Sequence, residues 1–190
     1  MKKLLFLLAL SALSGRCAAQ SPVPAARLFR ELPLVNGKVS YEALRPVCNT
    51  ARGELASRAA QWARDNQALL TPDTAQTTQT PDVTTLVLRG QLEQPPRGAF
   101  KDRNSYTFIC TVQAKDGKYR YAFNQFQWTY SLMNIAGEAV RGPLTYSLEN
   151  MSAADQQRYT ASRAEYLNGQ IEQLIKTLNT AMTHDEQLTW

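Results

Sequence analysis

The chain has 190 residues, 44% of them hydrophobic, which is enough for one folded domain with a hydrophobic core and too few for two full domains. Lys and Arg outnumber Asp and Glu by 21 to 16, but Lys2, Lys3 and Arg16 lie in the first 19 residues, and without them the balance is 18 to 16, a net charge of +2. A charge this small and this interspersed provides neither an electrostatic surface for duplex nucleic acid nor a polybasic membrane patch.

The first 19 residues have the pattern of a signal peptide. Lys2 and Lys3 precede the apolar run Leu4–Leu13, and the small residues Ala18 and Ala19 precede Gln20. We therefore predict cleavage after Ala19 and export to the periplasm or beyond the cell, with membrane association left open. The apolar run is shorter than the roughly 20 residues of a membrane-spanning helix, and no later segment comes close to that length.

Cys17 offers a second interpretation of the leader, because a cysteine at the end of a leader can be lipidated. The residue before a lipidated cysteine is normally small, and here it is Arg16, a long cation. This argues against lipidation.

Removal of the leader leaves two cysteines, Cys48 and Cys110. In an oxidising compartment they either pair, which stabilises by about 4 kcal/mol in the chain-entropy model, or remain two small buried hydrophobic side chains. The sequence leaves both alternatives open. The single histidine, His184, and two cysteines are too few for a structural zinc site, which usually has four ligands, so we predict no metal site and no cofactor.

Residues 20–31 form a proline-interrupted linker, and we predict one domain over residues 32–183. The pair Asn36-Gly37 predicts a tight two-residue turn. Val39, Tyr41 and Ala43 then alternate with polar residues, which predicts a strand with one apolar face.

A helix is predicted next, capped by Asn49 or Thr50. Its apolar residues at helical spacing are Leu55, Ala59, Trp62 and Ala63, and Trp62 is interpreted as a core residue. Residues 71–82 are nearly all polar and predict an exposed, mobile loop. Residues 83–92, rich in Val, Leu and Thr, predict a strand.

The strongest local signal is a hairpin centred on Asp116-Gly117, for which we predict a type I′ turn with Lys115 opposite Lys118. This register pairs Val112 with Tyr121, Cys110 with Phe123 and Phe108 with Gln125, on a face that suits packing by a helix. The opposite face then carries the candidate ligand-binding residues Ile109, Asn124, Phe126 and Trp128. The alternative is that this second face is covered by the loop 71–82 or by another subunit.

A last helix is predicted from Ser152, with a long apolar stripe, and residues 184–190 are predicted to be a disordered tail. The stripe consists of Tyr159, Tyr166, Ile171, Leu174, Ile175, Leu178 and Met182.

The segment Leu34–Glu42, the helix carrying Trp62 and the hairpin Lys115–Tyr121 together resemble an exported bacterial family of unknown function with a fold like the TATA-binding protein. The resemblance runs from about Leu32 to Tyr130 and, more loosely, through the last helix. It implies an α+β fold with a curved antiparallel sheet and helices on one face, in the order β-α-β-β-β-α. It transfers no catalytic residues. The nuclear protein bends DNA with a basic, Phe-wedged sheet, whereas this chain is almost neutral, so we predict no nucleic-acid partner.

No enzymatic chemistry is predicted. His184, near the C-terminus, is a poor candidate for the base of a nucleophilic triad, and the glycines form no phosphate-binding loop. We therefore predict a non-enzymatic module that binds a ligand or an envelope protein. The alternatives are an assembly protein that uses the sheet face as an oligomer interface and, with less support, a carboxylate-dependent hydrolase. The oligomeric state is left open.

Overall fold

The computed structural model describes residues 32–74, 76–96, 103–134, 136, 138–151 and 159–183, without the side chain of Arg141. The predicted leader with Cys17, the linker 20–31, the predicted helix start at Ser152 and the tail with His184 lie outside the described residues. Within the described residues, no helix is both long enough and apolar enough to cross a membrane.

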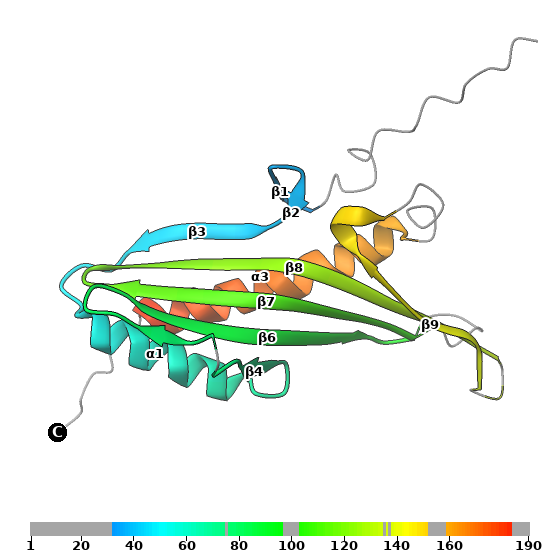
Figure 1. The fold of residues 1–190 in the computed structure, drawn as a ribbon, viewed down its shortest axis with the longest axis horizontal. Helices are drawn as coiled ribbons and strands as arrows, with labels where there is room; N and C mark the ends of the chain where they lie inside the picture. Colours follow the sequence, from blue (N-terminus) through cyan, green and yellow to red (C-terminus); the bar gives the residue numbers. More distant parts are fainter. Residues whose placement is uncertain are drawn as a thin grey trace, which may run out of the picture.

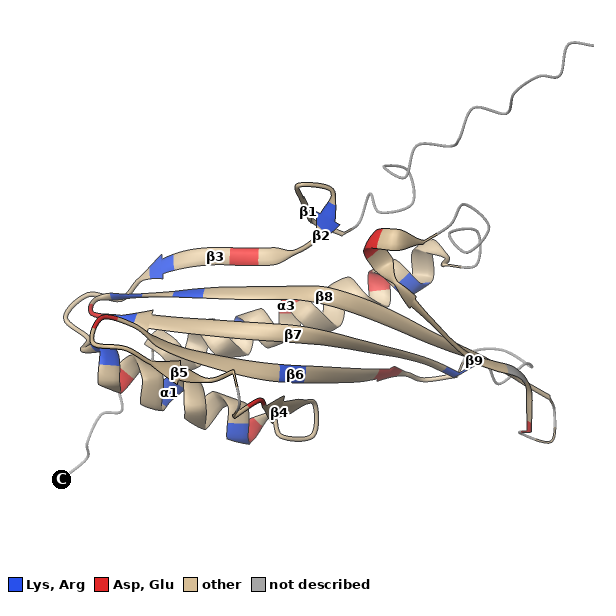
Figure 2. Cartoon of the chain, viewed as in Figure 1, with Lys and Arg blue, Asp and Glu red and all other residues tan. Residues whose placement is uncertain are grey.

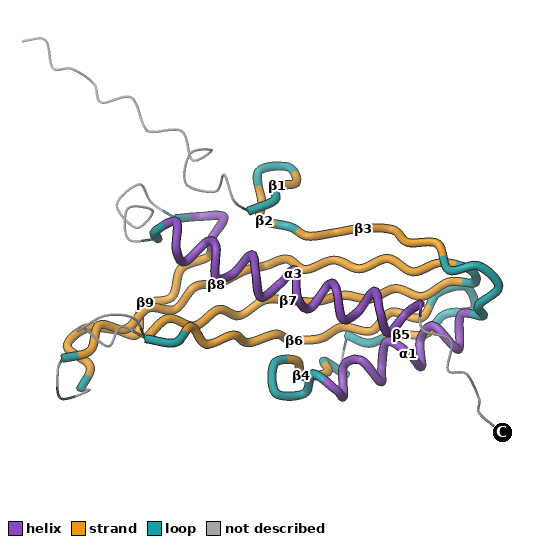
Figure 3. Tube along the Cα trace, turned by 180° about the vertical axis from the view of Figure 1, so that it is seen from behind, coloured by secondary structure: helices purple, strands orange, loops and turns teal. Residues whose placement is uncertain are grey.

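A seven-stranded antiparallel sheet forms one layer, and two helices lie together on one of its faces (Figures 1 and 3). The main strand order is β3-β8-β7-β6-β4, while β5 pairs with β6 and β9 with β8. The strands are β3 (Tyr41–Pro46), β4 (Leu70–Pro72), β5 (Thr78–Gln79), β6 (Thr84–Gln94), β7 (Arg103–Lys115), β8 (Lys118–Met133) and β9 (Ala139–Ser147). The helices are α1 (Arg52–Asp65), α3 (Ala161–Thr183) and the short 3-10 helix η2 (Leu148–Asn150). The predicted α+β fold with helices on one face is confirmed.

The two predicted hairpins are both present. β1 (Leu34–Val35) and β2 (Lys38–Val39) flank Asn36 and Gly37, whose φ angles are 51° and 77°. In the second hairpin Lys115 lies opposite Lys118, as predicted. The predicted type I′ turn is wrong, however, because Gly117 has a positive φ of 73° and Asp116 does not.

The Asp116 carboxylate takes part in a tertiary contact that the sequence did not suggest. Its Oδ1 accepts a hydrogen bond from the backbone N–H of Arg52 at 2.7 Å, at the first residue of α1. The predicted caps, Asn49 and Thr50, are wrong, since the N-cap residue is Ala51 and makes no side-chain cap. A carboxylate at a helix N-terminus is favourable because it satisfies a free N–H and complements the helix dipole.

The core lies between the helices and the sheet. The predicted buried face of α1 is confirmed, and the Trp62 indole N–H donates to Thr177 of α3 at 3.0 Å. From α3 the buried residues are Ala164, Leu167, Ile171, Leu174, Leu178 and Met182. The predicted helix is not continuous through Tyr159 and Thr160, which are not helical, and α3 begins at Ala161.

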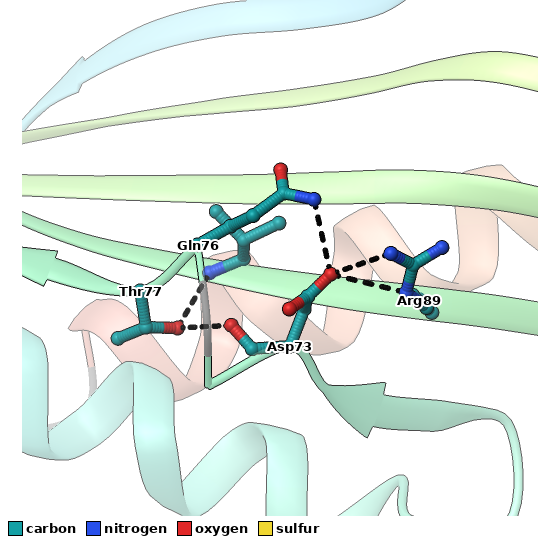
Figure 4. A network of polar contacts seen from close by, with 5 residues as sticks. Asp73, Gln76, Thr77 and Arg89 are labelled. Atoms are coloured by element: carbon teal, nitrogen blue, oxygen red, sulfur yellow. Dashed lines mark hydrogen bonds and ion pairs between the residues drawn. The ribbon is translucent and has the colours of Figure 1, made fainter.

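Residues 71–82 are exposed for the most part, as predicted, but they are not an unstructured loop. They contribute to β4 and contain β5, and both strands extend the sheet beside β6. Figure 4 shows the polar contacts that hold the segment between β4 and β5 in place. Asp73 Oδ2 lies 2.7 Å from Arg89 Nη2 and 3.1 Å from Gln76 Nε2. Thr77 Oγ1 donates to the carbonyl of Asp73 and accepts from the N–H of Val87. Because β4 and β5 pair with β6 in the plane of the sheet, they add to its edge.

Candidate functional site

Strand β8 contains a β-bulge at Gln125, and this bulge decides which side chains face the solvent. Ile109 of β7 lies opposite Asn124, and Thr107 lies opposite Gln127, so β8 has one extra residue between these pairs. Gln125 has a φ of 56°, the left-handed conformation of the first residue in one common bulge type. The extra residue reverses the alternation of side chains along the rest of the strand.

The predicted ligand-binding set is therefore divided. Phe126 and Trp128 were predicted on the open face, and this is wrong: both are 0% exposed and belong to the core under the helices. The Phe126 ring lies 5.6 Å from that of Phe108, and the predicted Phe108–Gln125 pair does not form. Ile109 and Asn124 do meet on the open face as cross-strand partners, both half-buried.

The predicted alternative of a disulfide between Cys48 and Cys110 is also wrong. Cys48 is exposed and Cys110 is buried, and both are free. Cys110 lies opposite Phe123, whereas Cys48 follows Pro46, which lies opposite Lys118. The stretch of β8 from Lys118 to Phe123 spans about 16 Å, and a disulfide needs Cα atoms within about 7 Å.

The open face carries two rows of polar side chains that cross four strands, and we call these the polar rows. The ladder register places the members of each row side by side. The first row is Gln91, Thr107, Gln127 and Ser147, and the second is Glu93, Ser105, Thr129 and Thr145. All eight side chains are exposed or half-buried.

Three side chains of the first row have no hydrogen-bond partner in the described part of the chain. Among the described residues, none forms a hydrogen bond with the side chains of Gln91, Thr107 or Gln127. In the second row, the hydroxyls of Thr129 and Thr145 lie 2.9 Å apart. Amides and hydroxyls both donate and accept hydrogen bonds, so the rows present alternating donors and acceptors across the sheet.

Charge is scarce around the polar rows. Figure 2 shows no Lys, Arg, Asp or Glu along β7 from Asn104 to Ala114 or along β8 from Tyr121 to Met133. The nearby guanidinium of Arg89 is paired with Asp73. Lys115, Lys118 and Arg120 gather instead at the hairpin end of the sheet.

A cavity of about 880 Å³ lies at β6 and includes three members of the first polar row. On the open face it is lined by Gln91, Thr107, Gln125 and Gln127. It continues around the edge of β6 to Tyr166 of α3, whose hydroxyl donates to the carbonyl of Glu93 at 2.7 Å. Burial, with the Glu93 carboxylate as the smaller cause, raises the pKa of Tyr166 above its usual range.

A second cavity, of about 640 Å³, lies where β6 ends and β7 begins, and we call it the end cavity. Gln94 and Asn104 line it as cross-strand partners, and they are only 6% and 8% exposed. Gln94 Oε1 is buried and accepts no hydrogen bond from the described residues. The Gln94 and Asn104 side chains both lie on the helix-covered face of the sheet, because they alternate with Glu93 and Ser105 of the open face.

The titratable groups with shifted pKa values do not form an acid–base pair in either cavity. Burial raises the pKa values of Cys110, Tyr106 and Tyr159, which belong to the helix-covered core. Within the described ranges, no group of three or more His, Cys, Asp or Glu residues is arranged to hold a metal ion.

Sequence reasoning missed the polar rows because it carried a strict alternation through β8. The signal was present: Asn124 and Gln125 are two consecutive polar residues between Phe123 and Phe126. A broken alternation of this kind indicates a bulge. Placing one extra residue there moves Gln127 to the open face and Trp128 to the core.

Comparisons with known proteins bear on the fold. No family model matches the chain, and no curated protein matches its sequence. A TBP-like protein from Parabacteroides distasonis superposes with a TM-score of 0.55 at 15% identity, covering 78% of this chain and 97% of that one. A DUF4468 family protein from Bacteroides ovatus has a TM-score of 0.57 at 13% identity, covering 83% of this chain and 93% of that one. The chain thus has the TBP-like fold that its sequence resemblance implied, shared with proteins whose descriptions give no activity.

Proposed function

We propose that this protein is an exported, non-enzymatic module that binds an uncharged oligosaccharide across the open face of its sheet. The observation that carries the proposal is the pair of polar rows. They cross four strands and lie on the face without helices, and the side chains of Gln91, Thr107 and Gln127 have no hydrogen-bond partner among the described residues.

The chemistry of the rows favours sugar hydroxyls over a charged ligand. A sugar hydroxyl donates and accepts in the same way as Thr107, and the amide groups of Gln91 and Gln127 provide both functions at fixed positions. A strongly anionic or cationic ligand is disfavoured because the only charged member of the rows is Glu93. Each hydrogen bond contributes about 0.5–1.5 kcal/mol, so we expect a modest affinity, with a Kd between about 1 mM and 1 µM.

The binding experiment uses the mature protein and cellotetraose, an uncharged oligosaccharide, in isothermal titration calorimetry. The double variant Thr107→Val with Gln127→Ala removes two hydrogen-bonding groups from the first row, and we expect the affinity to fall about tenfold or more. The matched control is Gln173→Ala, an exposed glutamine on α3, which should leave affinity unchanged. Absence of binding, or equal binding by the double variant, would contradict the proposal. A concentration-dependent dimer in light scattering that dissociates in the double variant would instead favour the oligomer interface.

Export is the second part of the proposal, and it is supported by the leader pattern of residues 1–19. We expect the protein recovered from the envelope or medium to begin at Gln20, as measured by N-terminal sequencing. Recovery of the intact precursor from the cytosol alone would contradict export.

A further inference from the structure

We propose that the open face holds a second site, separate from the polar rows, which binds a phosphate monoester at the hairpin end of the sheet. The site is a cavity of about 440 Å³, and we call it the hairpin cavity. Three of its lining residues are cations, which Figure 2 shows gathered at this end of β7 and β8. The cavity is lined by Leu44, Gln113, Lys115, Lys118, Tyr119 and Arg120.

The alternation of side chains along the hairpin places the polar groups of this cavity on the open face. Ala114 and Tyr119 are buried under the helices. The residues on either side of them therefore point the other way, away from α1 and α3. A ligand can reach the cavity without displacing any part of the core.

The two lysines of the hairpin cavity lie directly opposite each other. Lys115 and Lys118 are cross-strand partners beside the turn, and both are exposed. Like charges at such positions repel each other and reduce the stability of a sheet. Among the described residues, neither ammonium group has an ion-pair or hydrogen-bond partner. A bound anion would replace this repulsion by attraction to both lysines.

Two carboxylates belong to the same end of the sheet, and both are engaged by other groups. Asp116, in the turn between the lysines, accepts a hydrogen bond from the backbone N–H of Arg52 at the positive end of the α1 dipole. Glu42 lies 2.7 Å from the guanidinium of Arg120. The charges of the two lysines are therefore the uncompensated ones. A phosphate monoester carries a charge of about −1.5 to −2 at neutral pH, which matches them.

Gln113 adds a neutral donor and favours a phosphate over a carboxylate. It is half-buried, it lies opposite Arg120, and its amide forms no hydrogen bond with a described residue. The amide N–H group and the two ammonium groups are three donors, which match the three terminal oxygens of a phosphate monoester. A carboxylate has only two oxygens and a single charge.

The hairpin cavity lies away from the polar rows. The stretch of β7 from Thr107 to Lys115 spans about 26 Å. A phosphate bound at the hairpin therefore leaves the rows unoccupied, and the inference does not depend on the proposed binding of an oligosaccharide.

The test is an NMR titration of the mature protein with inorganic phosphate at low ionic strength, where charge attraction is screened least. We expect saturable amide shifts over residues 113–120. The double variant Lys115→Gln with Lys118→Gln should weaken binding about tenfold or more, because it removes two charge-assisted hydrogen bonds. The matched control, Lys38→Gln with Lys176→Gln, removes the same charge from two exposed positions elsewhere and should leave the affinity unchanged.

The phosphate can belong to a soluble ligand or to a lipid headgroup, and co-sedimentation with vesicles distinguishes the two sources. Phosphatidylcholine vesicles with phosphatidic acid, whose headgroup is a phosphate monoester, are compared with phosphatidylcholine alone. Retention on the first vesicles only, lost in the hairpin variant, assigns the lipid source. Saturable shifts without retention assign the soluble source.

Several results would overturn the site. Absence of both saturable shifts and retention would do so, as would equal weakening by the hairpin variant and its control. In the unmodified protein, shifts around Lys38 and Lys176 as large as those at the hairpin would show that phosphate follows lysines in general.

Discussion

The two halves of β8 on either side of Gln125 both bury aromatic side chains under the helices, but one half buries its odd-numbered residues and the other its even-numbered residues. Before the bulge, the odd-numbered residues Tyr119, Tyr121 and Phe123 are buried under the helices. After it, the even-numbered Phe126 and Trp128 are buried. By absorbing one extra residue, the bulge keeps the aromatic side chains of this long strand on the buried face and leaves the other face polar. The difference teaches that the function of a side chain in this sheet depends on its position relative to the bulge.

Trp128→Ala tests whether Trp128 is a core residue or an exposed residue available to a ligand. The ring is fully buried, stacks on Tyr146 with centroids 5.5 Å apart and donates to Asn104. We expect a loss of about 3–5 kcal/mol in the free energy of unfolding, measured with urea. A loss below about 1 kcal/mol would be the behaviour of a surface residue and would return Trp128 to the open face.

Glycine substitutions should reveal the bulge conformation directly. Gln125 has a φ of 56°, which is costly for a residue with a Cβ, so Gln125→Gly should stabilise the protein by up to about 1 kcal/mol. The matched control, Gln127→Gly, lies in regular strand two residues later and should destabilise by about 0.5–1 kcal/mol. Two changes of the same sign would contradict a left-handed Gln125.

Thr107→Val should have the smallest effect on stability, because Thr107 is exposed on the open face and makes no hydrogen bond with a described residue. We expect a change within about 0.5 kcal/mol in the same urea experiment. A much larger loss would mean that the polar rows support the fold, and any effect of this substitution on sugar binding would then be indirect.

Local patterns predicted the parts of the fold that depend on neighbouring residues. The turn at Asn36-Gly37, the buried face of α1 and the hairpin register from Lys115 to Phe123 all follow from spacing and turn chemistry. The alternation of side chains along the two hairpin strands also correctly predicted that Ile109 and Asn124 lie together on the open face.

The features that sequence reasoning missed depend on distant partners. β9 contains Gly142-Pro143, a pair that is typical of a turn or loop, yet the strand is held by pairing with β8. β4 and β5 form because β6 lies beside them. The division of the predicted ligand-binding set also depends on a distant partner. Trp128 points inward only because the pairing of β8 with β7 shifts by one residue at the bulge.

The contact between Asp116 and the first residue of α1 links two segments that are 64 residues apart in the chain. During synthesis, residues 52–65 emerge from the ribosome well before Asp116 exists, so the beginning of this helix lacks its cap until the hairpin has been made. This order of events agrees with the proposed export, because a chain that is to cross a translocation channel must not complete its fold before it has been synthesised.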